Sequence, residues 1–263
     1  MPVCLPPEDS QDAAWRGRDQ AGRVPAPLPE PVSVDLDHPM PEIIPMFAVP
    51  FGFTKLEGCE ALNAELRELF IAREAEGARH ANPRPLTQRN PQVFESSFDL
   101  FKWPDAPIQR LKRFCWLHLM RMVGDLNGYD DAKLQQILIY SDSWFHVTRR
   151  GGFFALHNHP MAAWSGVYCV SPGQHDPDKP DSGLLSFLNP SITGAMFIDV
   201  ANANMKGAYA NDIRHVRLEP GQLVLFPSWV LHDVKPFEGD GERITIAFNC
   251  WFQLKDADSS RGS

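Results

Sequence analysis

The sequence predicts a mainly β fold, a sandwich or barrel, with two helices packed on the outer face of one sheet. From Leu134 to Gln253, short runs rich in β-branched and aromatic residues alternate with turns that carry glycine or proline. Strands at such short spacing, with no helices between them, are typical of sandwiches and barrels. Two helical patterns precede this stretch. The chain has 263 residues, 43% of them hydrophobic, which suits one domain with a substantial core.

The expected domain organisation has three parts. Residues 1–40 hold eight of the 24 prolines and show no regular hydrophobic period, which predicts a disordered arm. Residues 41–254 are expected to form a single domain, in which a helical segment over residues 57–128 supports a β core over residues 134–254. The polar tail, residues 255–263, is expected to be flexible.

The first ordered elements are expected to be an edge strand and a helix. Ile43–Leu56 is apolar but interrupted by Pro45 and Pro50, and proline cannot donate a hydrogen bond within a central strand. The next segment, Glu57–Glu76, has one apolar face and is followed by Gly77, so it is expected to be helical. The apolar face consists of Leu62, Leu66, Leu69 and Phe70.

A second helix is expected over Pro107–Leu126. Proline stands in its first turn and Gly128 follows its end, as is common at these positions. Residues 80–104, between the two helices, are expected to form mostly loop, with a short strand near Val93–Phe101. The predicted buried face of the second helix consists of Ile108, Leu111, Cys115, Leu119 and Met122, with His118 beside it.

Composition excludes several classes of protein. The net charge of −8 and the pI near 5.6 argue against a nucleic-acid-binding protein, which would show clustered basic residues. The five cysteines are scattered and odd in number, a pattern typical of reduced thiols. No apolar run approaches the roughly 18 residues of a membrane helix, and the start lacks a signal peptide's pattern. We therefore expect a cytoplasmic protein that binds neither membrane nor nucleic acid, with a homodimer as one open alternative.

Three histidines form the candidate metal site. His157 and His159 are spaced H-x-H, and His232 follows about seventy residues later. On a β-strand, alternate side chains point to the same face, so the first two imidazoles would converge there. Neutral imidazole suits iron, zinc, copper or nickel better than magnesium or calcium. The sequence therefore predicts a three-histidine metal site inside a barrel.

The positions of these histidines resemble the two motifs of the cupin superfamily. Gly151 precedes His157-x-His159, and Gly221 and Pro227 precede His232. A cupin would carry a glutamate ligand shortly after H-x-H, where this sequence has Ala163 and Trp164, and a glycine where it has Trp229.

A second resemblance covers more of the chain, from about Gln88 to Phe252. The phrases SWFHV, HNHP, SGVYCV, SGLLSFLNP, LFPSWVLHDV and RITIAFN resemble a bacterial H-x-H-P branch of the Fe(II)/2-oxoglutarate-dependent oxygenases. The resemblance implies a double-stranded β-helix, a jelly-roll or cupin-like barrel. It also implies Fe(II) as cofactor, 2-oxoglutarate as co-substrate, and O2 and a small molecule as further substrates.

Residue by residue, the resemblance implies the following roles. His157 and His232 take the first and third metal-ligand positions of the family. Arg243, eleven residues after His232, begins an R-x-T phrase with Thr245 and takes the position that binds 2-oxoglutarate. The sequence departs from the family at the middle ligand, where His159 replaces Asp or Glu. Cys169 and Ser191 are further departures from the expected phrases.

Other residues are candidates for the pocket lining. These are Trp144, His146, Ser165, Tyr168 and Asn249. Asp233, next to His232, is expected to point the other way along its strand, whereas His175 and His215 are expected to be bystanders. The loop Pro172–Ser182 is expected to be either a lid or a solvated excursion.

Two alternatives to the oxygenase remain open. One is a cupin-type three-histidine metalloenzyme that does not use 2-oxoglutarate, and the other is an inactive barrel that binds a metal or a ligand. Arg243 favours the oxygenase, because the cupin interpretation gives it no role.

Overall fold

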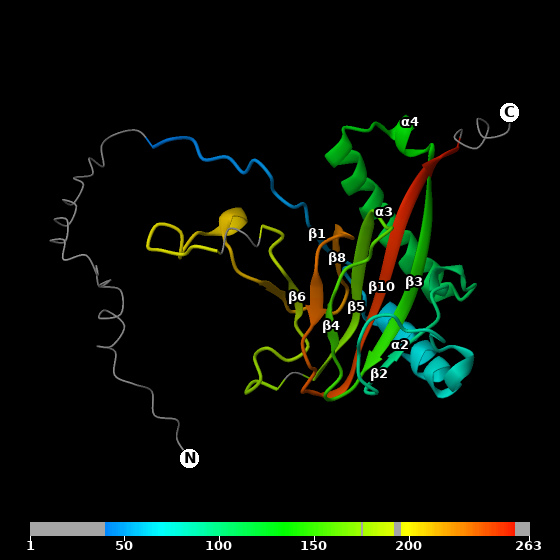
Figure 1. Ribbon diagram of the computed structural model, residues 1–263. Helices are drawn as coiled ribbons and strands as arrows, with labels where there is room; N and C mark the ends of the chain where they lie inside the picture. The colour runs from blue at the N-terminus through cyan, green and yellow to red at the C-terminus, as the bar shows by residue number, and fades with distance from the viewer. Residues whose placement is uncertain (1–39, 175, 192–195, 256–263) are drawn as a thin grey trace, which may run out of the picture. The chain divides into compact units, whose positions relative to one another are not determined.

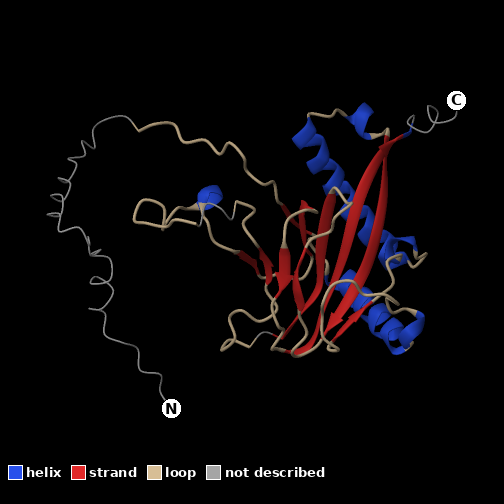
Figure 2. Cartoon of the chain, in the orientation of Figure 1, coloured by secondary structure: helices blue, strands red, loops and turns tan. Residues whose placement is uncertain are grey.

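The computed structural model describes residues 40–174, 176–191 and 196–255. The chain divides into two units, Met1–Ile44 and Pro45–Ser263, and all elements below belong to the second. This unit is built on two antiparallel sheets, with helices on one side of the larger sheet (Figures 1 and 2). The expected arm and tail lie outside the described residues except for Met40 and Lys255, and so does His175.

The larger sheet has six strands, and its centre is the long strand β10. In spatial order, the strands are β1 (Gly52–Lys55), β8 (Gln222–Pro227), β5 (Trp164–Gln174), β10 (Asp240–Leu254), β3 (Ile137–Thr148) and β2 (Val93–Glu95). Strand β10 pairs with β3 from Arg243 to Leu254 and with β5 on its other side. Strand β1 lies at the sheet edge, as expected, although it begins only after Pro50.

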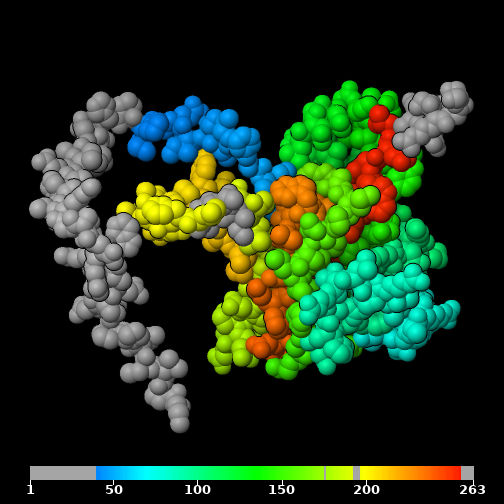
Figure 3. Space-filling view, in the orientation of Figure 1, coloured from blue at the N-terminus to red at the C-terminus, as the bar shows by residue number. Residues whose placement is uncertain are grey.

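The smaller sheet has four short strands. Their order is β4 (Phe154–His157), β9 (His232–Val234), β6 (Leu185–Phe187) and β7 (Arg214–Val216). An apolar cluster joins the two sheets, because it contains residues of β5 and β8 together with residues of β6. In the connection from β6 to β7, the described residues from 196 onward, yellow in Figure 3, include the exposed side chains of Met196, Phe197 and Val200.

Two long helices cover the other face of the larger sheet. They are α2 (Glu60–Ala75) and α3 (Ala106–Asn127), and Gly128 ends α3 in the left-handed conformation, as expected. The sequence analysis missed the short helix α4 (Asp131–Leu134). The described 3₁₀ turns are η2 (Gly77–Arg79), η3 (Leu100–Lys102) and η5 (Gly207–Tyr209).

Alternation along β10 separates two environments. Ile244, Ile246 and Phe248 belong to the cluster that includes α2 and α3, whereas Arg243 and Thr245 face the opposite side. Since neighbouring side chains of a strand point to opposite faces, the helices bury the apolar set and the polar set lies between the sheets. The helical layer therefore determines which face of β10 becomes a cavity wall.

Helix α2 is attached to the sheet largely through aromatic contacts. Phe70 is fully buried, and its ring stacks on Phe145 of β3 with centroids 4.1 Å apart. Tyr168 of β5 is also fully buried on this face, and its hydroxyl donates to Asn63 Oδ1 of α2 at 2.8 Å. No helix of the described chain is long and apolar enough to cross a membrane.

Truncation of Phe70 should destabilise the protein strongly. Phe70→Ala removes a fully buried ring between α2 and β3, and such a change typically costs about 3–5 kcal/mol. Urea denaturation measures the loss. Leu117→Ala, at a 52% exposed position of α3, should change the free energy of unfolding by less than about 0.5 kcal/mol. Equal effects of the two changes would show that the helical layer does not support the sheet.

Candidate metal centre and its cavity

A cavity of about 740 Å³ lies between the two sheets. Its walls include the inward side chains of β3 and β10, the ends of β4 and β9, and parts of the loop before β2. All three candidate histidines line it, together with Arg243 and Thr245. The cavity volume is in the range of small-molecule sites.

His157 and His232 reach the cavity from paired strands. The two residues are direct partners between β4 and β9. The Nδ1 atom of His157 lies 2.7 Å from the Ala155 carbonyl oxygen, and Nδ1 of His232 lies 2.9 Å from the Val230 carbonyl oxygen. A carbonyl oxygen only accepts, so each Nδ1 carries the proton and each Nε2 keeps a free lone pair. Both rings are therefore held in the tautomer that a metal ion needs at Nε2.

His159 reaches the site differently from the expectation. Strand β4 ends at His157, so His159 lies in the turn that follows and not on the same strand. Its backbone N–H donates to the Ser228 carbonyl oxygen at 2.9 Å, which ties this turn to the segment just after β8. Met161, two residues further on, has a φ of 77°, so the chain reverses sharply there before β5. The turn, rather than strand periodicity, brings the second imidazole to the site.

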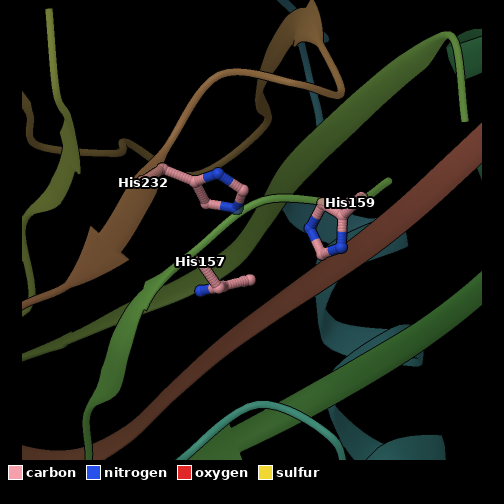
Figure 4. Close-up of side chains that lie close together, drawn as sticks. All are labelled: His157, His159 and His232. Carbon is pink, nitrogen blue, oxygen red and sulfur yellow. The ribbon is translucent and has the colours of Figure 1, made fainter. Parts of the chain in front are cut away.

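The three imidazoles converge on one point (Figure 4). One ligand atom from each lies within 4.8 Å of the others, and they are the only such group of histidine, cysteine or acidic side chains among the described residues. The ring centroids are 4.3 Å apart for His157–His232 and 5.1 Å for each of the other pairs. Nitrogen ligands about 2.1 Å from one metal ion are at most about 4.2 Å apart, so small side-chain movements suffice. The donor set fits a transition-metal ion.

Burial keeps these histidines neutral. Desolvation, together with the neighbouring imidazoles, lowers the pKa of His159 to about 3. Desolvation also lowers the pKa of His232 to about 4, and it lowers the pKa of His157. Neutral imidazole is the form that ligates metals, so protons compete little with a metal ion near neutral pH.

Arg243 is a buried cation without a polar partner. It is 4% exposed, and in the described part of the chain its guanidinium makes no hydrogen bond or ion pair. Desolvation lowers its pKa, yet arginine stays protonated in proteins. Thr245, 2% exposed, points into the same cavity two residues along β10. An unpaired buried charge is costly, so this end of the cavity suits an anion.

Four of the five other lining candidates do face the cavity, namely Trp144, His146, Ser165 and Asn249. The expectation for Tyr168 is wrong, since its ring packs under α2 and α3 on the opposite face of β5. The alternation of side chains along β5 explains this placement, because Ser165 faces the cavity and Tyr168 lies an odd number of residues away.

Asp233, His215 and Ser191 lie outside the group of three histidines. Asp233 pairs with Lys235 at 3.0 Å, and His215 is exposed on β7 beside Ser186. Ser191 is exposed. The described residues of the loop Pro172–Ser182 do not line the cavity, so they do not form a lid over it.

Glu95, Phe98 and Asp142 are among the lining residues that sequence reasoning missed. Glu95 is buried, and its carboxylate accepts from Asn82 at 2.7 Å and lies 3.1 Å from His146 Nε2. Trp144 Nε1 donates to the same His146 nitrogen at 2.9 Å. Acidic residues in loops and strands are usually solvated, so the sequence carried no signal for Glu95 or Asp142.

A comparison with known protein families gives one match, which covers less than half of the chain. Residues 142–249 match the family described as "Putative 2OG-Fe(II) oxygenase". This region contains the three histidines, Arg243 and Thr245. No curated protein matches the chain.

Solved structures share the fold at low sequence identity. A prolyl-4-hydroxylase from Pseudomonas putida is 17% identical, with 77% of this chain and 92% of that chain covered and a TM-score of 0.50. The non-haem α-ketoglutarate-dependent carbocyclase SnoK from nogalamycin biosynthesis is 12% identical, with 82% and 87% covered and a TM-score of 0.52. The expected double-stranded β-helix with helices packed on one sheet is confirmed.

Removal of any one of the three imidazoles should reduce iron binding. His157→Ala, His159→Ala and His232→Ala each delete one of three converging ligand atoms, so Fe(II) content should fall well below one per chain. His146→Ala should leave the iron content near that of the wild type, because His146 does not belong to the group. Metal analysis after anaerobic loading measures the iron content of all four variants. Stoichiometric iron in His159→Ala would exclude this residue as a ligand.

The metal-free protein should lose stability as the pH falls from about 6.5 to about 4. Unfolded histidines take up protons near pH 6.5, whereas folded His159 and His232 do so only near pH 3 and 4. The unfolded state therefore binds more protons in this window, and each histidine contributes a slope of about 1.4 kcal/mol per pH unit. Urea denaturation at several pH values measures this slope. The slope of the unfolding free energy against pH should be shallower for His159→Gln than for the wild type. Identical slopes would contradict the lowered pKa of His159.

Proposed function

We propose that this protein is a 2-oxoglutarate-dependent dioxygenase with an all-histidine iron site that hydroxylates a small molecule. The match of residues 142–249 to the 2OG-Fe(II) oxygenase family supports this proposal. In this proposal, His157, His159 and His232 hold Fe(II). Arg243 and Thr245 bind the carboxylate of 2-oxoglutarate that lies far from the metal.

The observation that carries the proposal is the unpaired Arg243. A cation with 4% exposure and no acidic partner among the described residues is expensive to bury, and a plain barrel core would not keep one. A dicarboxylate that binds the metal at one end would offer a carboxylate to this guanidinium at the other. The planar guanidinium bonds a carboxylate through two parallel hydrogen bonds, and Thr245 adds a hydroxyl on the same face of β10.

The three-histidine set favours an anionic co-substrate. A carboxylate ligand would cancel part of the charge of Fe(II), whereas three neutral imidazoles cancel none. The site together with Arg243 would therefore carry a strongly positive field, to which a 2-oxo acid is complementary. The chemistry that Fe(II) supplies when bound is the activation of O2, by which oxidative decarboxylation of 2-oxoglutarate is coupled to oxidation of the substrate.

The chain's own contribution is orientation and exclusion of water. The backbone carbonyls at residues 155 and 230 hold two imidazole rings in place through their Nδ1 protons. Phe226 and Phe187 pack beside His232, with ring centroids 5.0 and 6.0 Å from it, and both are buried. These rings therefore cover one side of the His232 imidazole with apolar surface.

Arg243→Met should weaken 2-oxoglutarate binding without loss of iron. Truncation of one partner of a buried hydrogen-bonded charge pair typically costs about 2–5 kcal/mol. Anaerobic titration of 2-oxoglutarate into the Fe(II)-loaded protein, followed by the metal-to-ligand absorption band, measures the affinity. The affinity of Arg243→Lys for 2-oxoglutarate should lie between those of Arg243→Met and the wild type. Lysine keeps the positive charge but lacks the planar guanidinium, which can form two parallel hydrogen bonds.

Arg67→Met is the matched control for this measurement. Arg67 is half-exposed on α2 and pairs with Glu242 outside the cavity, so its loss should leave the 2-oxoglutarate affinity unchanged. An unchanged midpoint in Arg243→Met would defeat the role of Arg243. Absence of the band in the wild type would favour a cupin-type metalloenzyme or a binding barrel.

A further inference from the structure

Besides Arg243, a second charged group without a partner lines the cavity, at the end away from Arg243. Asp142 of β3 lines the cavity and is partly buried. In the described part of the chain, its carboxylate makes no hydrogen bond and no ion pair. The described wall contains one cationic side chain, that of Arg243, and one other carboxylate, that of Glu95.

Glu95 differs from Asp142 because its charge is already compensated. It accepts from Asn82 and lies against His146, with Arg89 Nε 3.9 Å away. Asp142 has none of these neighbours. A ligand that enters the cavity therefore meets one carboxylate that is free to accept.

Asp142 lies too far from Arg243 to bind the same small dicarboxylate. Asp142 is the cross-strand partner of Asn249, which is six residues from Arg243 along β10. Six residues of a strand span about 20 Å, more than twice the length of a five-carbon dicarboxylate. A second carboxylate would also repel such an anion. The end of the cavity near Asp142 is thus left for the substrate.

The surroundings of Asp142 are aromatic on one side and polar on the other. Trp144, two residues along β3, is about 6.6 Å further into the cavity, and its ring lies 5.9 Å from that of His159. The ring of Phe98 lies 4.5 Å from that of Trp144. On the other strand, Asn249 Oδ1 accepts from Ser165 at 2.7 Å, so its amide N–H groups remain for a ligand.

We propose that the substrate is a small molecule with a protonated amine, which Asp142 binds beside the aromatic faces of Trp144 and Phe98. The inference rests on the proposed function, since it takes the end of the cavity near Arg243 to be occupied by the co-substrate. A carboxylate accepts a charge-assisted hydrogen bond from an ammonium group, and aromatic faces attract cations. The amide of Asn249 would donate to a neighbouring oxygen of the same molecule. Since Trp144 contacts His159, an amine held at Asp142 places the adjoining carbons towards the metal.

The test uses benzylamine and its neutral analogue benzyl alcohol as probes. Calorimetric titration into the full-length, Fe(II)-loaded protein under anaerobic conditions, with and without 2-oxoglutarate, gives the affinity for each. The wild type should bind benzylamine at least about 10-fold more tightly than benzyl alcohol, as expected for a hydrogen bond to a charged group. Asp142→Asn, which keeps the shape, should abolish this preference. Asp178→Asn, at an exposed position outside the cavity, should retain it.

Each outcome separates this inference from the proposed function. Asp142→Asn should still bind Fe(II) and develop the 2-oxoglutarate band, which shows that the variant is folded and its co-substrate site intact. Equal affinity of the wild type for both probes, no benzylamine binding, or an unchanged preference in Asp142→Asn would overturn the amine inference. Absence of the 2-oxoglutarate band in the wild type would instead defeat the proposed function, whereas the preference for the amine could still be measured on the protein loaded with metal alone.

Discussion

The structure depends above all on the double pairing of strand β10. The strand is hydrogen-bonded to β3 on one side and to β5 on the other, so its register is tightly determined. A shift by one residue would exchange the two faces, which would bury Arg243 among the helices and turn Ile244 into the cavity. Because α2 and α3 cover one face with apolar side chains, that exchange would be very costly. The apolar packing outside the barrel thus fixes the position of the polar groups inside it.

The cavity concentrates polar groups whose burial is unfavourable. Three imidazoles with lowered pKa values and one unpaired guanidinium lie between the two sheets. Burial of such groups without partners lowers stability, and a protein core would gain from apolar replacements. A metal ion and an anionic co-substrate would offset these costs. The same arrangement explains why the site is neutral at its histidines and positive at Arg243, a combination that suits metal ligation at one point and carboxylate binding at another.

The paired strands β4 and β9 and the turn after β4 make different contributions to the metal centre. Strand pairing sets His157 directly opposite His232, and a backbone carbonyl holds each ring. His159 depends on a turn that is tied to Ser228 by one backbone hydrogen bond. Its ring has no hydrogen-bond partner among the described residues. Two ligands are therefore held firmly and the third has more freedom to adjust, which is compatible with closure of the three nitrogen atoms around a metal ion.

The sequence by itself predicted the mainly β class and the two helices, because hydrophobic periodicity and helix-ending glycines are local signals. It also singled out the three histidines by their spacing and Arg243 by the family resemblance, and the structure places all four on the wall of one cavity. Only the tertiary structure decided that His159 lies in a turn and that Tyr168 packs under the helices. It alone placed Asp142 in the cavity. Which face of a strand is covered, and which charge lacks a partner, depends on elements far apart in the chain that meet only in the fold.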